Sequence, residues 1–138
     1  MGATIELKLL SPRTIEVLRI QAFTGWSTYP VTITGARGEP IDGYKGLQVL
    51  GRCGRLSSEP LRHDIRISPG GRAYRATIGL RFEPESWDGS DFFMPEDETA
   101  YVFVTQRVVD ALALHHISGL IAQPMSEYEW FGSSWDWI

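Results

Sequence analysis

The chain has 138 residues and a formal net charge of −4, and 43% of its residues are hydrophobic and 22% charged. This size and composition are typical of one globular domain with its own core, and they exclude a disordered chain. A single cysteine, Cys53, excludes an intramolecular disulfide and a cysteine-cluster metal site. We therefore expect one domain over residues 1–138.

The location of the protein is predicted from what the sequence lacks. No apolar run approaches the roughly 18 residues of a membrane-spanning helix. The first ten residues do not have the charged-then-apolar layout of a signal peptide. Together with the single cysteine, this predicts a cytoplasmic protein that does not associate with membranes.

Charge is divided unevenly along the chain. Residues 1–82 carry 12 Lys and Arg against six Asp and Glu, a net charge of +6, whereas residues 83–138 carry one arginine against 11 acids, a net charge of −10. Two interpretations are open. The halves can neutralise each other through ion pairs, or the acidic half can form a face that attracts a basic partner.

The first 50 residues predict β-strands. Apolar and polar residues alternate over 4–10 and 14–23, on either side of a Ser-Pro-Arg turn, which is the pattern of a half-buried hairpin. Shorter strands are predicted at 31–34 and 46–50.

A second hairpin is predicted from 64–68 and 72–82, joined by Pro-Gly-Gly. Alternation predicts one apolar face, formed by Ile65, Ile67, Tyr74, Ala76, Ile78 and Leu80, and one basic face, formed by Arg66, Arg75 and Arg81. A basic face of this kind can follow a phosphate backbone, so a nucleic-acid-binding domain is one alternative function. However, Tyr74 lies on the face opposite Arg75, and a sequence pI near 5.3 disfavours non-specific binding to nucleic acid.

Residues 83–99 are acidic, rich in proline and glycine, and have an aromatic centre at 92–94. We expect a long ordered loop here, a type of segment that often carries binding residues. A buried strand at 100–104 then leads into a helix over 105–117 that begins at Thr105, and another strand follows at 119–125. The predicted fold class is α+β, with a twisted, mostly antiparallel sheet and one principal C-terminal helix packed on it.

Motifs for catalysis, cofactors and metals are not evident. The chain has no Walker phosphate loop, GxGxxG, HExxH or GxSxG pattern. His115 and His116 are neighbours on the predicted helix and point about 100° apart, so they cannot both bind one metal ion. Cys53 and a histidine leave a small cysteine-dependent hydrolase or transferase as a second alternative. We otherwise expect no catalytic residue, no metal and no cofactor.

The last 12 residues, EYEWFGSSWDWI (127–138), contain three tryptophans among acidic residues. The segment 127–131 is expected to continue the last strand and pack on the core. Beyond Gly-Ser-Ser, residues 133–138 form either a surface for a partner or a plug that folds back on the core.

Three segments, GYKGLQVLGRCGRL (43–56), WDGSDFFMP (87–95) and YVFVTQRVVDALALHHISGL (101–120), resemble a family of small cytoplasmic immunity proteins from bacterial polymorphic toxin systems. The resemblance covers about residues 43–125. It implies that the chain neutralises a cognate toxin protein by direct binding, without chemistry or a cofactor.

A stable inhibitor needs aromatic anchors surrounded by polar groups, and charges that attract its partner. Acidic and aromatic residues of the 83–99 loop and of the C-terminal segment meet this requirement. Whether the chain also self-associates is left open by the sequence. The predicted partner-binding residues are Trp87, Asp88, Asp91, Phe92, Phe93, Glu127, Glu129, Trp130, Trp135, Asp136 and Trp137.

Overall fold

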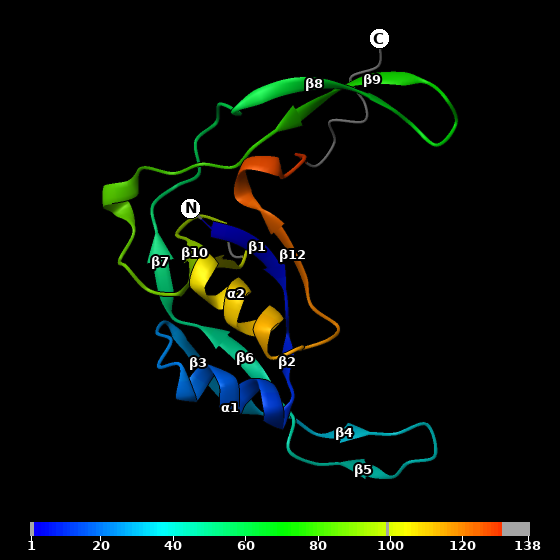
Figure 1. The fold of residues 1–138 in the computed structure, drawn as a ribbon, viewed down its shortest axis with the longest axis vertical. Coiled ribbons are helices and arrows are strands. Elements are labelled where there is room, and N and C mark those ends of the chain that lie inside the picture. Colours follow the sequence, from blue (N-terminus) through cyan, green and yellow to red (C-terminus); the bar gives the residue numbers. More distant parts are fainter. Residues whose placement is uncertain (1, 99, 131–138) are drawn as a thin grey trace.

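The protein has a mixed α/β fold with mostly antiparallel sheets, seen in a computed structural model that describes residues 2–98 and 100–130 (Figure 1). Its largest sheet has the strand order β12-β1-β11-β10-β7. All neighbours in this sheet are antiparallel except β10 and β7, which are parallel. The strands are β1 (Gly2–Glu6), β7 (Gly51–Cys53), β10 (Phe92–Pro95), β11 (Phe103–Thr105) and β12 (Ile121–Pro124).

Smaller sheets extend the molecule. A three-stranded sheet has the order β2-β6-β3, and two hairpins, β4-β5 and β8-β9, project from opposite ends of the long axis (Figure 1). Two short 3-10 helices, η1 (Pro84–Ser86) and η2 (Met125–Glu127), lie in the connections. The strands are β2 (Leu9–Leu10), β3 (Trp26–Pro30), β4 (Ile33–Thr34), β5 (Pro40–Ile41), β6 (Lys45–Val49), β8 (Arg62–Ile67) and β9 (Ala73–Ile78).

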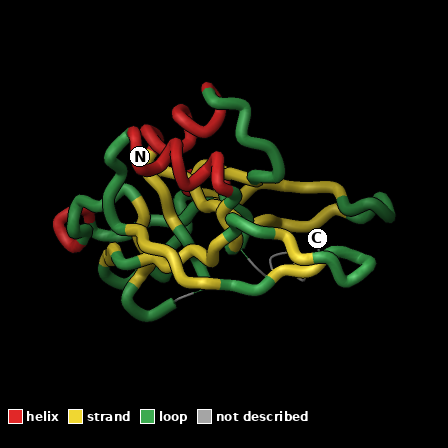
Figure 2. The backbone as a smooth tube through the Cα atoms, turned by 90° about the horizontal axis from the view of Figure 1, so that it is seen from below, coloured by secondary structure: helices red, strands yellow, loops and turns green. Residues whose placement is uncertain are grey.

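The described residues form two α-helices of 9 residues each, α1 (Pro12–Ile20) and α2 (Gln106–Leu114). Both lie on the same side of the strand layer (Figure 2). No helix in the described part of the chain has the length and apolarity required to cross a membrane. The prediction of one principal helix is wrong in this respect, because α1 is as long as α2.

The prediction of a strand at 14–23 is also wrong, because this segment forms most of α1. Pro12 occupies the start of the helix, and the side chain of Ser11 accepts a hydrogen bond from the backbone N–H of Thr14 at 3.1 Å. Ser-Pro is therefore a helix cap here and not a turn. Ile15, Val17 and Leu18 are buried. The spacing of Ile15 and Val17 is that of a strand, in which alternate residues share a face. Leu18 lies three residues after Ile15, which is the spacing of a helix face.

The second predicted hairpin is confirmed as β8 and β9, but the predicted faces are wrong. The register pairs Ile65 with Arg75 and Arg66 with Tyr74. Directly paired residues share a face, so Ile65 and Arg75 lie on one side while Arg66 lies on the other. Alternation holds within each strand, but the register between the strands is shifted by one residue from the predicted one. The arginines are thus divided between the two faces and do not form one basic stripe.

A hydrophobic core fills the space between the sheets and the helices. The large sheet contributes Ala3, Ile5, Phe92 and Val104, and the helices cover them with aliphatic side chains. Val108 and Leu112 of α2 are fully buried in this core. The helix ends at Leu114, earlier than predicted, and His116 then takes a left-handed conformation with φ of 54°.

Candidate protein-binding surface

Phe92 and Phe93 do not lie in a loop but in β10, near the centre of the large sheet. Consecutive strand residues point to opposite faces. Phe92 enters the core under the helices, and Phe93 packs on the other face with Phe103. Their exposures are 0% and 1%, so neither ring is presented to a partner. Their assignment to a binding surface is corrected, because a short strand ending in proline resembles a loop in sequence.

Aromatic side chains cover the face of the large sheet that the helices leave open. The centroid of Trp87 lies 5.4 Å from that of Phe93, which lies 5.5 Å from that of Phe103. Tyr101 continues the series, with centroid distances of 5.8 Å to Phe103 and 5.4 Å to Tyr128. We call these five side chains the aromatic row. Its inner rings are buried, whereas Trp87, Tyr101 and Tyr128 are partly exposed.

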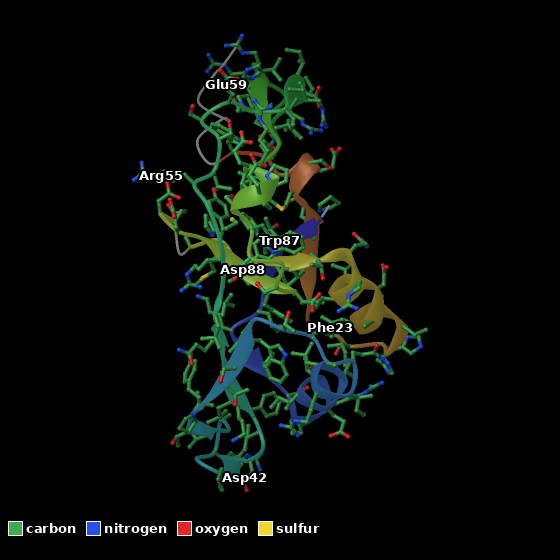
Figure 3. The ribbon with its side chains drawn as sticks, turned by 90° about the vertical axis from the view of Figure 1, so that its left-hand side faces the viewer. Phe23, Asp42, Arg55, Glu59, Trp87 and Asp88 are labelled. Carbon is green, nitrogen blue, oxygen red and sulfur yellow. The ribbon has the colours of Figure 1, made fainter. Side chains whose placement is uncertain are left out.

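Trp87 and Asp88 lie side by side beside β7 (Figure 3). The indole N–H of Trp87 donates to the carbonyl oxygen of Ser90 at 3.1 Å, which fixes the ring above Phe93. The carboxylate of Asp88 accepts the backbone N–H of Arg52 at 2.9 Å and that of Ser90 at 3.0 Å. Partial burial raises the pKa of Asp88, but hydrogen bonds from Ser90 and Arg52 outweigh it and lower the pKa. Asp88 is therefore an exposed, fixed negative charge.

Two glycines allow this arrangement. A Cβ on Gly51 would lie 1.9 Å from the Ser90 hydroxyl, and a Cβ on Gly25 would lie 2.2 Å from the carbonyl oxygen of Phe92. Any larger residue at either position would push the Trp87 loop away from the sheet.

Further carboxylates gather around β7 from the segment after β10. Glu96, Asp97 and Glu98 are exposed. The backbone N–H of Glu96 donates to the carbonyl oxygen of Cys53 at 3.0 Å. Burial raises the pKa of Cys53 most, and the charges of Asp88, Asp97 and Glu96 raise it further, to about 11. Asp88 from one segment and Glu96 and Asp97 from another thus raise the pKa of the same buried thiol. Cys53 is only 2% exposed and remains a thiol at neutral pH, which disfavours it as a nucleophile.

Tyr101 connects these acids to the aromatic row. Burial raises its pKa most, and a hydrogen bond with Tyr128 and the charge of Glu98 raise it further, to about 12. The phenol is therefore neutral and keeps its hydroxyl proton at physiological pH. Sequence reasoning missed Tyr101 and Tyr128 as surface residues. The sequence does contain a signal for Tyr101: it lies two residues before Phe103, and alternate residues of a strand point to the same face.

Asp91 is a structural residue and not a partner-binding one. It is 6% exposed and accepts hydrogen bonds from the backbone N–H of Thr24 at 3.0 Å and from the hydroxyl of Thr105 at 2.9 Å. The guanidinium of Arg107 forms an ion pair with it at 3.1 Å. Burial raises the pKa of Asp91, but these bonds outweigh it and lower the pKa. Asp91 thus ties the segment after α1 to the start of α2.

The described end of the chain packs against the β8-β9 hairpin, which agrees with the core packing predicted for 127–131 as far as Trp130. The backbone N–H of Trp130 donates to Thr77 at 2.8 Å, and its indole N–H donates to Gly79 at 2.7 Å. Glu127 pairs with Arg62 at 2.8 Å, and Glu129 forms a hydrogen bond with Tyr74 that raises the pKa of that tyrosine. The predicted residues Trp135, Asp136 and Trp137 lie outside the described residues.

Ion pairs between described residues join the basic and acidic halves of the chain, among them Arg62 with Glu127 at 2.8 Å and Arg55 with Glu96 at 3.9 Å. Partial neutralisation between the halves is therefore present, while Asp88, Asp97 and Glu98 remain exposed. In the described ranges, no group of three histidine, cysteine or acidic residues is placed to hold a metal ion.

Comparison with known proteins adds no relative: no protein-family model and no curated protein matches this sequence.

Proposed function

We propose that this chain is an immunity-type binding protein that neutralises a cognate bacterial toxin by direct contact. The contact surface is the one formed by Trp87, Asp88, Glu96, Asp97, Glu98 and Tyr101, which we call the acidic-aromatic surface. One observation carries the proposal. Two partly exposed rings, Trp87 and Tyr101, belong to the same surface as carboxylates from two chain segments, Asp88 and residues 96–98. The resemblance of three sequence segments to immunity proteins points to the same function.

The composition of this surface favours tight protein contact. Trp and Tyr provide large contact areas with few rotatable bonds, and they are enriched among residues that dominate binding energy. Trp87 is held by Ser90 and Phe93, so little side-chain entropy is lost when a partner covers it. The rings therefore supply the stable part of the contact.

The carboxylates favour a basic partner. Hydrogen bonds keep the pKa of Asp88 low, so its charge persists well below neutral pH. An excess of negative charge accelerates encounter with a basic partner, and this effect weakens with salt. The toxin is accordingly expected to present a basic surface to this face.

Co-expression tests the proposal. The toxin domain encoded next to this gene is induced in bacteria with and without the protein, and surviving colonies are counted. We expect the wild-type protein to restore growth and the double variant E96K/D97K to lose protection at least about tenfold, because two charges are reversed. Glu16→Lys, an exposed acid on α1, is the matched control and should protect like the wild type.

Two results contradict the proposal. One is a wild-type protein that gives no protection. The other is a folded E96K/D97K variant that protects as well as Glu16→Lys. Trp87→Ala separates the contribution of the aromatic rings from that of the carboxylates. We expect this variant to speed dissociation of the purified complex and to leave the salt dependence of association unchanged.

A further inference from the structure

One edge of strand β8 is unpaired among the described residues. The strand pairs with β9 on one side, and within residues 2–98 and 100–130 no strand pairs with its other side. Ile65 and Ile67 on its outer face are 61% and 67% exposed. Open edges of natural sheets are usually protected by lysine, proline or a covering segment. Two exposed isoleucines on such an edge are instead suited to pairing with another strand.

The sequence of β8 is complementary to itself. Asp64 and Arg66 stand at equal distances on either side of Ile65. If a second copy runs antiparallel with Ile65 opposite Ile65, then Asp64 of each copy lies opposite Arg66 of the other. Opposite charges directly across a strand pair are stabilising. In the same register, His63 of each copy lies opposite Ile67 of the other.

The guanidinium of Arg66 is incompletely hydrogen-bonded within the part of the chain that the structure describes. Its Nη2 lies 3.8 Å from the carboxylate of Asp64, beyond hydrogen-bond distance. Its Nε–H is shielded from solvent and has no hydrogen-bond partner among the described residues. Covered donors without acceptors are uncommon in folded proteins. The Asp64 carboxylate of a second copy would bring a further acceptor to this arginine.

We propose that the chain forms a two-fold symmetric dimer by antiparallel pairing of β8 with β8 of a second copy, centred on Ile65. The contact is isologous, since the same residues serve both copies and the assembly closes at two. A pair of six-residue strands is a small interface, so a weak dimer that dissociates on dilution is expected. β8 shares no residue with the acidic-aromatic surface, so this inference does not depend on the proposed function.

Sedimentation velocity of the full chain, extended to hundreds of micromolar, tests the dimer. The wild type should shift from monomer to dimer with concentration. Ile65→Lys places two ammonium groups at the symmetry axis and should raise the dimer dissociation constant at least about tenfold. The matched control is Ile20→Lys on α1, at a position that is 69% exposed and far from the axis, and it should dimerise like the wild type.

A charge exchange tests the register. Asp64→Arg and Arg66→Asp should each weaken the dimer, because each places like charges opposite one another, and the double variant D64R/R66D should restore it. Circular dichroism establishes that each variant is folded. If an Asp64 variant does not fold, Ile65→Lys still tests the dimer. The proposal is overturned by a wild type that stays monomeric, by equal effects of Ile65→Lys and Ile20→Lys, or by a folded double variant as weak as the single ones.

Discussion

The two faces of the large sheet are built from the same strands but closed in different ways. Under the helices, Phe92, Val104, Val108 and Leu112 have 0% exposure. On the other face, Phe93 and Phe103 are equally buried, but the rings that cover them are themselves partly exposed. The face under the helices is therefore a closed core, whereas the outer rings on the aromatic face remain accessible to solvent.

This difference separates stability from recognition. Side chains that are fully buried can contribute to folding but cannot touch another protein. Rings that lie half in the core and half in solvent do both, because one side anchors them and the other remains available. Substitutions on the two faces can break or sharpen this comparison, and the largest effects are expected from the inner rings.

Truncating the inner rings tests whether both faces are cores. We expect Phe92→Ala and Phe93→Ala each to lower the free energy of unfolding by about 3–5 kcal/mol, because each leaves a cavity in a packed interior. Urea denaturation followed by circular dichroism measures this. Tyr44→Ala is the control. Because Tyr44 is 39% exposed, this variant should lower the free energy of unfolding much less. A small effect of Phe93→Ala alone would show that the aromatic face is not a core.

Asp91 is the polar connection on the helix side. Asp91→Ala removes the buried carboxylate that accepts hydrogen bonds from Thr24, Thr105 and Arg107. We expect a loss of about 2–3 kcal/mol in the free energy of unfolding. Glu16→Ala, an exposed acid on α1, should change it little. Equal stability of the two variants would contradict the role of Asp91.

The same residue predicts a dependence on pH. The pKa of Asp91 is lower in the folded protein than its ordinary value of 3.8. Its contribution to stability is therefore complete above that value and is lost as pH falls through the folded pKa. The difference in the free energy of unfolding between the wild type and Asp91→Ala should therefore shrink progressively as the pH falls below 3.8.

The sequence predicts the elements whose signals are local. Strand alternation locates β8 and β9, and helical spacing of Val108 and Leu112 locates α2. Prediction fails where a local pattern has two solutions. Ser-Pro at 11–12 begins a turn or caps a helix equally well, and only the buried Leu18 decides for the helix.

The candidate site is less predictable than the fold. Trp87 and Asp88, predicted as partner-binding residues, are accessible in the structure, but the sequence also predicts Phe92, Phe93 and Asp91 at the surface. The strand that carries the two rings is short and flanked by acids and proline, so it resembles a loop. Asp88, Glu96 and Asp97 all act on Cys53 of β7, and Glu96 and Asp97 reach it through the parallel pairing of β10 with β7, which joins residues about 40 positions apart. No local pattern contains that information.

A matched pair of tryptophans compares the two faces directly. The indole N–H of Trp26, beside the helix-face core, donates to Phe23 at 2.9 Å, and that of Trp130, beside the aromatic row, donates to Gly79 at 2.7 Å. Replacement by phenylalanine keeps an aromatic ring and removes the donor. We expect each variant to lose about 1 kcal/mol in urea denaturation. A neutral Trp130→Phe beside a costly Trp26→Phe would show that the chain end is not anchored as described.

The smallest effect concerns the charges around Cys53. Its pKa, near 11 in the folded protein against 9.0 ordinarily, is raised first by burial and then by Asp88, Asp97 and Glu96. Asp97→Asn should therefore lower this pKa by a fraction of a unit, because it removes one negative charge but leaves the burial unchanged. Thiolate absorbance during an alkaline titration measures the shift, and Asp110→Asn, on the exposed side of α2, should leave it in place. If the two variants titrate alike, the carboxylates do not converge on β7. The aromatic face would then lack the concentrated charge that distinguishes it from the helix face.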